Sequence, residues 1–160
     1  MVRHFQTTPI ATLATMLLLA GGLCAESKNV CPVTKPNGSV PPGESSCPSC
    51  LGNGTQWAGL YPEGRVVFTP GGPGFILNDG SLSMKFWWWR GVPGKLTITG
   101  RRLDAPAPPL RASIPEGYGD IGFQATALIF PTVGCWQVTG KVRESRLTFV
   151  TLVVKASEVK

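Results

Sequence analysis

The acid–base side chains that usually carry hydrolytic chemistry are scarce in this chain. Its only histidine, His4, lies in an N-terminal segment typical of an export signal, so the mature protein is expected to have no histidine. Glu63 and Asp79 fall in expected turns, and Glu116 and Asp120 flank a Gly-Tyr-Gly loop, so turn geometry already accounts for these carboxylates. We therefore predict that the protein is not an enzyme.

Cysteine is the other reactive side chain, and the chain has five. Cys47-Pro48-Ser49-Cys50 has the C-x-x-C spacing of disulfide-exchange proteins, but no helical pattern follows it to stabilise a thiolate. Four-cysteine zinc sites usually have two close pairs of cysteines, whereas this chain offers one close pair and two distant single cysteines. We expect a local or structural disulfide at Cys47 and Cys50, with no metal and no other cofactor.

The pairing of the cysteines depends on export to an oxidising compartment, where thiols tend to pair. Cys31, Cys47, Cys50 and Cys135 permit three pairings, and the sequence alone does not choose among them. We favour Cys31 with Cys135, and Cys47 with Cys50. The first bridge would tie an irregular N-terminal segment to a late strand, and closing so long a loop is worth about 4 kcal/mol in the chain-entropy relation.

Four consecutive aromatic residues, Phe86-Trp87-Trp88-Trp89, are the strongest local feature of the sequence. Successive side chains of a strand point to opposite faces, so the four rings cannot all enter one core. With Phe86 and Trp88 facing inward, the outward side chains are Lys85, Trp87 and Trp89. Exposed rings of this kind form stacking platforms for sugars or peptides.

Two further aromatic residues, Trp57 and Tyr61, belong to an earlier expected strand and extend either this platform or the core. Coverage of Trp87 and Trp89 by the N-terminal segment or a Pro-rich loop is favoured over a binding role, since exposed aromatic patches are uncommon on monomers.

The elements that would position these side chains begin after an expected secretory signal peptide over residues 1–24, cleaved near residues 22–25. Residues 1–9 carry Arg3 and no acidic residue, and residues 10–20 form a short apolar run closed by small residues. Leu23 precedes Cys24 where a bacterial lipoprotein signal has a small residue, so ordinary cleavage is favoured over lipidation of Cys24. The protein is then periplasmic, envelope-associated or extracellular, and it meets a membrane only through the signal or such a lipid anchor.

Two segments of different composition follow. Residues 25–52 are rich in Pro, Gly, Ser and Asn and lack apolar periodicity, which predicts an irregular leader. Residues 53–156 contain short apolar runs separated by turn signals, which predicts one β-sandwich domain without a convincing helix. The last strand, apolar on both faces near its end, is expected inside the fold. The expected strands are 55–61, 65–69, 74–77, 81–90, 95–100, 110–114, 122–130, 135–142 and 146–155, with hairpin turns at 62–64 and 78–80.

Part of the sequence also resembles a known class of domains. Residues 130–139, FPTVGCWQVT, resemble the turn into the penultimate strand of bacterial immunoglobulin-like domains. Together with residues 31–39 and 71–75, they make the chain similar to uncharacterised exported bacterial proteins with a C-terminal immunoglobulin-like β-sandwich. The resemblance implies this fold and no activity. It also favours the pairing of Cys31 with Cys135, and it implies that Trp136 packs in the core against that bridge.

The whole chain has a net charge of +6, but its basic residues are scattered and no nucleic-acid motif accompanies them, so no nucleic-acid partner is expected. The sequence thus predicts an exported, non-enzymatic binding or structural module built on an immunoglobulin-like antiparallel β-sandwich. Binding of carbohydrate or cell wall through exposed tryptophans is the more specific form of this prediction. The alternative is a protein-interaction accessory domain of an envelope assembly, joined through an edge strand.

Overall fold

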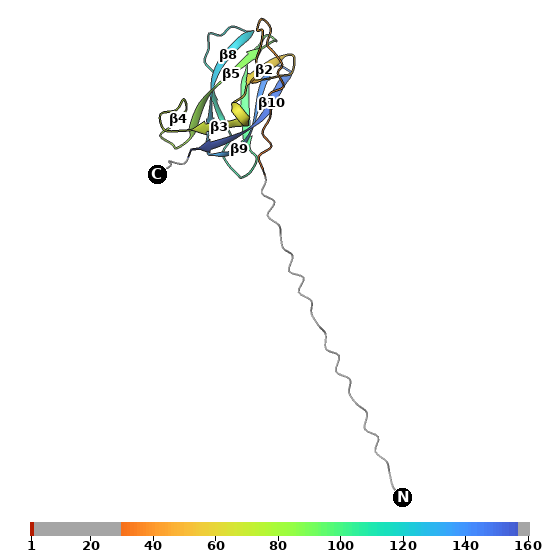
Figure 1. The fold of residues 1–160 in the computed structure, drawn as a ribbon, viewed down its shortest axis with the longest axis vertical. Helices are drawn as coiled ribbons and strands as arrows, with labels where there is room; N and C mark the ends of the chain where they lie inside the picture. Colours follow the sequence, from red (N-terminus) through yellow and green to blue (C-terminus); the bar gives the residue numbers. More distant parts are fainter. Residues whose placement is uncertain (2–29, 157–160) are drawn as a thin grey trace.

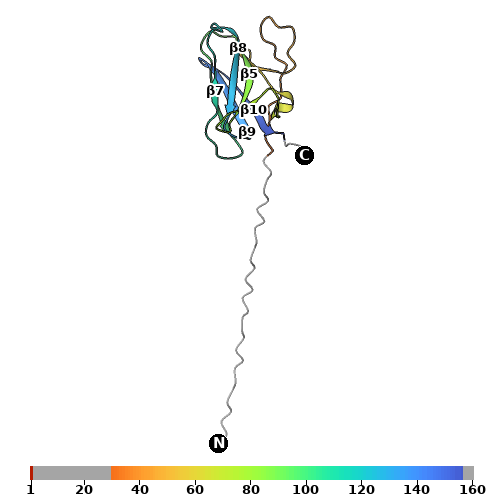
Figure 2. The same cartoon turned by 90° about the vertical axis from the view of Figure 1, so that its left-hand side faces the viewer.

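The computed structural model describes Met1 and residues 30–156, so the expected signal peptide after Met1, including Cys24, lies outside the described residues. Two β-sheets pack against each other (Figures 1 and 2). The all-β prediction is confirmed, and within the described residues the one helical element is a short 3-10 turn, η1 (Pro62–Gly64). The strands are β1 (Cys50–Gly52), β2 (Gln56–Gly59), β3 (Arg65–Phe68), β4 (Phe75–Ile76), β5 (Leu82–Arg90), β6 (Thr97–Arg102), β7 (Arg111–Ser113), β8 (Gly122–Phe130), β9 (Gly134–Val142) and β10 (Ser145–Lys155).

The strands are divided between a six-stranded and a four-stranded sheet. The six-stranded sheet has the order β1-β2-β5-β8-β7, with β4 also paired to β5, and the four-stranded sheet has the order β3-β10-β9-β6. β1 lies within the segment expected to be irregular, so the sheet begins before the expected domain boundary at residue 53. β10 lies between β3 and β9, as its apolar character predicts. In the described part of the chain, no helix is long and apolar enough to cross a membrane.

The prediction of a β-hairpin with its turn at residues 62–64 is wrong. β2 belongs to the six-stranded sheet, whereas β3 pairs in parallel with β10 in the other sheet, which is therefore mixed rather than antiparallel. The turn at η1 carries the chain from one sheet to the other, and the Thr151 hydroxyl of β10 donates a 2.9 Å hydrogen bond to the Gly64 carbonyl at the crossing. A turn signal reports a change of chain direction but does not say which strand the next segment will pair with.

The turn expected at residues 78–80 is present and joins β4 to β5. The Leu77 amide donates to the Ser81 carbonyl at 2.9 Å, and the Asp79 carboxylate accepts the Ser81 amide at 3.0 Å. β4 itself has only two paired residues, Phe75 and Ile76, and both are 61% exposed. The hairpin is therefore real, but its first strand is much shorter than the expected segment.

The core lies between the sheets and follows the alternation expected for β5. Phe86 and Trp88 are buried, and both rings pack against Phe149 of β10 with centroids 5.8 Å apart. The indole of Trp88 occupies the space that a Cβ atom would need at Gly140 on the facing strand β9. Trp136 is also fully buried, against Phe130 at 5.7 Å. The inward side chains of β5 thus pack against the facing sheet, which provides aromatic partners and a glycine that leaves room for Trp88.

Candidate binding site

A row of aromatic side chains crosses the outer face of the six-stranded sheet. The register places Trp57 of β2 opposite Trp89 of β5, and Trp89 opposite Phe123 of β8. Residues directly opposite each other on neighbouring strands share a face of the sheet, so these three side chains lie in one row. Gly52 of β1 stands at one end of this row, and Trp87 lies two residues from Trp89 on the same face.

Trp57 is not an exposed part of this face, because the leader covers it. Its side chain is only 5% exposed, and its indole N–H donates a 2.9 Å hydrogen bond to the Ser39 hydroxyl. The side chain of Asn37 fixes the leader here. Its Nδ2 donates to the Gly52 carbonyl at 2.8 Å, and its Oδ1 accepts a hydrogen bond from the Gly52 backbone amide at 3.0 Å. The indole also fills the space above Gly52 that a side chain would need.

Tyr61 belongs to the margin of the core rather than to the aromatic row. Its ring packs edge-on against Phe86 at 5.1 Å, and its hydroxyl donates to the Lys85 carbonyl at 2.7 Å. Burial raises the pKa of the Tyr61 hydroxyl above its ordinary value. Tyr61 therefore packs against β5 and does not line the pocket that Trp87 and Trp89 share.

Trp87 and Trp89 are half-buried and line a pocket of about 210 Å³ together with Phe123, which is 46% exposed. The indole of Trp87 lies against the backbone of Gly59, in the place where a Cβ atom would stand. Small residues flank Trp87, because its cross-strand partner on the other side is Ala125. The expected covering of these two rings by the leader is therefore only partial. The residues that line the pocket are Pro41, Glu44, Ser46, Cys47, Trp87, Trp89 and Phe123.

The leader supplies the second wall of this pocket through two tight turns. In the first, the Glu44 amide donates to the Pro41 carbonyl at 3.2 Å, and Gly43 has φ +87, at the position where a type II turn favours glycine. In the second, Cys47 and Cys50 form a disulfide, and the Cys50 amide donates to the Cys47 carbonyl at 3.1 Å. Cys50 is part of β1, so the disulfide fixes the leader wall to the sheet.

Lys85 is exposed on the same face of β5, but it lines a different hollow from the pocket between Trp89 and the leader. This second hollow, of about 350 Å³, is bordered by Lys85, Tyr61, Gly59 and Trp87. Trp87 lines both hollows, so its indole separates the one that contains Lys85 from the one that contains Glu44.

Phe123 is the site residue that sequence reasoning missed. Its ring packs at 5.8 Å against Tyr118, whose loop is held by Arg90. The Arg90 side chain is 3% exposed and donates to the carbonyls of Gly94 at 3.1 Å and Tyr118 at 3.0 Å. The alternation of β8 gave no usable signal, because the polar residues Gln124 and Thr126 face inward while Phe123 shares the outward face with alanines.

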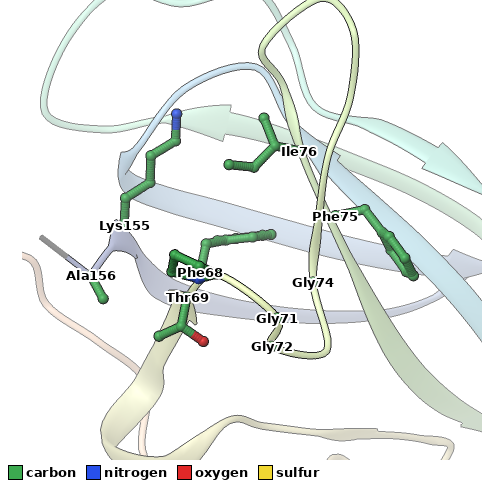
Figure 3. A pocket seen from close by; sticks show the side chains of 10 residues that line it. Phe68, Thr69, Gly71, Gly72, Gly74, Phe75, Ile76, Lys155 and Ala156 are labelled. Atoms are coloured by element: carbon green, nitrogen blue, oxygen red, sulfur yellow. The ribbon is translucent and has the colours of Figure 1, made fainter. Parts of the chain in front are cut away.

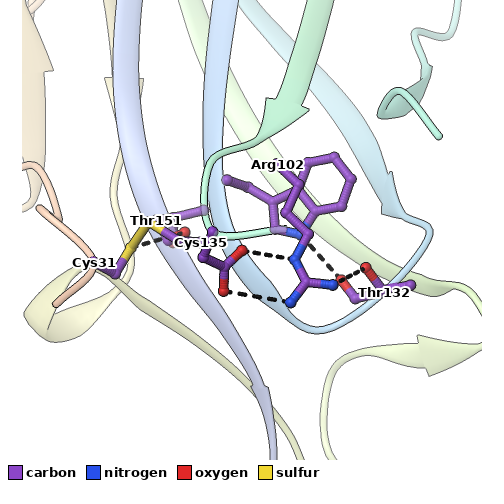
Figure 4. Close-up of polar contacts among 7 residues, drawn as sticks. Cys31, Arg102, Thr132, Cys135 and Thr151 are labelled. Carbon is purple, nitrogen blue, oxygen red and sulfur yellow. Dashed lines mark hydrogen bonds and ion pairs between the residues drawn. A yellow bond between two sulfur atoms is a disulfide. The ribbon is translucent and has the colours of Figure 1, made fainter. Parts of the chain in front are cut away.

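The Cys31–Cys135 disulfide lies apart from this pocket, at the start of β9, with the two Cα atoms 5.4 Å apart (Figure 4). Both pairs that the sequence favoured are thus the pairs that the structure joins. Beside this bridge, Arg102 donates to the Asp104 carboxylate at 2.6 Å and to the Thr132 hydroxyl at 3.2 Å. The hydrogen bond from Arg102 lowers the pKa of Asp104. This cluster anchors the leader and the β9 turn.

A wider hollow, of about 620 Å³, lies at the end of the sandwich near β4 (Figure 3). Phe68 and Ile76 border it over a loop of glycines, and Lys155 is the charged residue in its lining. The hollow is wide, but its polar groups do not converge as they do in a site built to orient a ligand.

The four candidate carboxylates lie in three places, and Glu63 is exposed in η1, away from the other three. Asp79 accepts hydrogen bonds from Ser81 and pairs with Arg111 at 2.7 Å, in the turn before β5. Glu116 and Asp120 line one hollow of about 210 Å³ at the opposite end of β5. Among the described residues, no group of three or more His, Cys, Asp and Glu side chains gathers in a metal-binding arrangement.

The comparisons with known proteins find no matching family model, no similar curated protein and no similar solved structure. Of the five predicted ligand-binding residues, the structure brings Trp87 and Trp89 into one pocket and buries Trp57 under the leader. Lys85 and Tyr61 line the neighbouring hollow, where the Tyr61 ring also packs against Phe86.

Proposed function

We propose that this chain is an exported, non-enzymatic binding module that holds a carbohydrate, such as a segment of cell-wall glycan, against Trp87 and Trp89. The observation that carries the proposal is the pocket formed by Trp87, Trp89 and Phe123 below a leader wall that is cross-linked to β1. Aromatic rings offer broad apolar faces to the C–H faces of sugars, and a preformed site loses little conformational entropy on binding.

The fold that we propose for this module is an immunoglobulin-like sandwich. The strand order β2-β5-β8-β7 in one sheet and β10-β9-β6 in the other supports it, because it follows the A-B-E-D and G-F-C orders of that topology. The short β3, parallel to β10, then occupies the place beside the last strand. The disulfide differs from the usual inter-sheet bridge, since Cys31 comes from the leader rather than from a core strand.

Export is the location that we propose, and two disulfides in a chain of this size support it. The Cys31–Cys135 and Cys47–Cys50 bridges persist most readily in an oxidising compartment. A periplasmic, envelope or extracellular location also places the module where cell-wall glycans occur.

The experiment is calorimetric titration of the oxidised protein with soluble glycan fragments and oligosaccharides, together with intrinsic tryptophan fluorescence. We expect saturable binding that Trp87→Ala and Trp89→Ala each weaken at least about tenfold, because stacked rings at the centre of a site carry most of its affinity. Phe75→Ala is the matched control, since Phe75 is an exposed aromatic residue on β4 outside the pocket. Absence of saturable binding, or equal losses for all three variants, would refute the proposal.

A second candidate function is protein interaction through the β4 edge. β4 pairs only with β5 among the described strands, and it presents Phe75 and Ile76, each 61% exposed, beside the hollow in Figure 3. An extended partner segment adding to such an edge would gain main-chain hydrogen bonds and apolar contacts. A native envelope complex that Phe75→Lys abolishes and Trp87→Ala leaves intact would favour this function over glycan binding.

A further inference from the structure

The pocket of Trp87 and Trp89 has a distinctive charge. Among the residues that line it, Glu44 is the only charged one, in a chain whose net charge is +6. The other side chains of the lining are aromatic rings, a proline, a serine hydroxyl and a disulfide sulfur. Any electrostatic preference of this pocket therefore comes from one carboxylate and three rings.

The carboxylate of Glu44 is available to a ligand. The ion pairs found within residues 30–156 join Arg102 to Asp104 and Arg111 to Asp79, and neither involves Glu44. Glu44 is exposed, and its backbone is fixed by the hydrogen bond of its amide to the Pro41 carbonyl. Glu44 thus lines the aromatic pocket without an ion pair to any cation among the described residues.

Aromatic faces and a carboxylate favour the same kind of ligand group. The face of an indole or phenyl ring carries a negative potential that attracts cations, most strongly for tryptophan. Lys85, the cation on this face of β5, lines the hollow on the other side of Trp87. A positively charged group entering beside Glu44 therefore meets attractive groups on both walls of the pocket.

We propose that the ligand of this pocket is an amino sugar with a free ammonium group, as in a deacetylated hexosamine glycan. The inference rests on the proposed glycan binding and specifies its substrate class. The sugar ring lies against Trp87 and Trp89, the ammonium group lies toward the carboxylate of Glu44, and the hydroxyl of Ser46 is placed to accept or donate a hydrogen bond. N-acetylation removes the positive charge, so the acetylated form of the same glycan binds more weakly.

The test compares β-1,4-linked glucosamine oligosaccharides with their fully N-acetylated counterparts and with choline, by calorimetric titration. We expect the glucosamine oligomer to bind roughly fivefold to tenfold more tightly than the acetylated one, from an exposed ion pair and one or two cation–π contacts. Glu44→Gln should remove most of this difference, because the glucosamine oligomer then loses its ion pair. Glu144→Gln, which alters an exposed glutamate in the turn between β9 and β10, is the matched control and should have no effect.

The outcomes separate the two proposals. If the acetylated oligomer binds at least as tightly and Glu44→Gln changes nothing, the amino-sugar inference is wrong while glycan binding stands. If neither oligosaccharide binds, the amino-sugar inference is wrong, and glycan binding is then decided by the titration with cell-wall glycan fragments. Binding of choline alone would assign the pocket to quaternary ammonium groups instead. A preference for glucosamine that weakens with added salt and with Glu44→Gln, but not with Glu144→Gln, supports the inference.

Discussion

The indole N–H of Trp57 donates a 2.9 Å hydrogen bond to the hydroxyl of Ser39, and this contact divides the outer aromatic row into two parts. On the Trp57 side the leader covers the sheet, and the tryptophan is only 5% exposed. On the Trp89 side the leader stands away from the sheet and forms a pocket wall instead. Three outward tryptophans of one face thus have two different roles.

Trp57→Ala and Trp87→Ala are expected to differ in their effect on stability. Truncating the covered Trp57 should lower the free energy of unfolding by about 3–5 kcal/mol, because it leaves a large cavity and removes a hydrogen bond. Truncating the half-buried Trp87 should cost only about 1–2 kcal/mol. Urea denaturation followed by circular dichroism measures both, and equal losses would show that the leader does not protect Trp57 in solution.

Gly59→Ala is expected to impair ligand binding at the pocket, because its new methyl group lies on the outer face of the sheet and not in the core. The new methyl group would occupy the place of the Trp87 indole, so the ring must move and ligand affinity should fall toward that of Trp87→Ala. Gly140→Ala is the matched change on the inner face, because its methyl group meets the buried Trp88 instead. It should cost about 1–3 kcal/mol of stability through overpacking. Calorimetric titration and thermal unfolding of both variants check the contrast, which fails if Gly59→Ala binds like the wild type.

Removal of the two disulfides should have unequal effects on unfolding. The Cys31–Cys135 bridge spans a sequence separation of 104, and replacing both cysteines by alanine should lower the free energy of unfolding by about 4–5 kcal/mol. The Cys47–Cys50 bridge spans a separation of only 3, and its loss should cost about 2 kcal/mol by the same relation. Guanidinium denaturation of the two double variants tests this order, and a larger loss at Cys47 and Cys50 would contradict it.

Asp79 should make the protein less stable in acid. Hydrogen bonds from Ser81, and then the interaction with Arg111, lower the pKa of Asp79 to about 2. Because this folded-state pKa lies below the ordinary value near 4, the stability from Asp79 is fully present above about pH 4 and is lost as the pH falls toward 2. Unfolding measured from pH 7 to pH 2 should show a smaller acid loss in Asp79→Asn. Ser81→Ala should reproduce more of this change than Arg111→Gln, and the reverse order would assign the low pKa to the ion pair.

Much of the local structure was predictable because it depends on neighbours in sequence. The alternation of residues 81–90 identified Phe86 and Trp88 as inward and Trp87 and Trp89 as outward, since the pleat of a strand fixes which side chains share a face. The turn at Asp79 was predictable for the same reason, because its carboxylate bonds to a backbone amide two residues away. A turn does form at residues 62–64, as predicted. The strand pairing after it was predicted wrongly, because the pairing of β3 with β10 depends on contacts far along the chain.

The sequence by itself determined that this chain is rich in strands, where most of them lie, and which residues of β5 face the core. The tertiary structure alone decided which outward rings stay accessible. Ser39 covers Trp57, the Glu44 turn stands over Trp87 and Trp89, and Phe123 joins them only through the register of β8 with β5. Strand alternation acts over two residues, whereas the covering of a sheet face is set by hydrogen bonds and disulfides between distant segments, which no local pattern encodes.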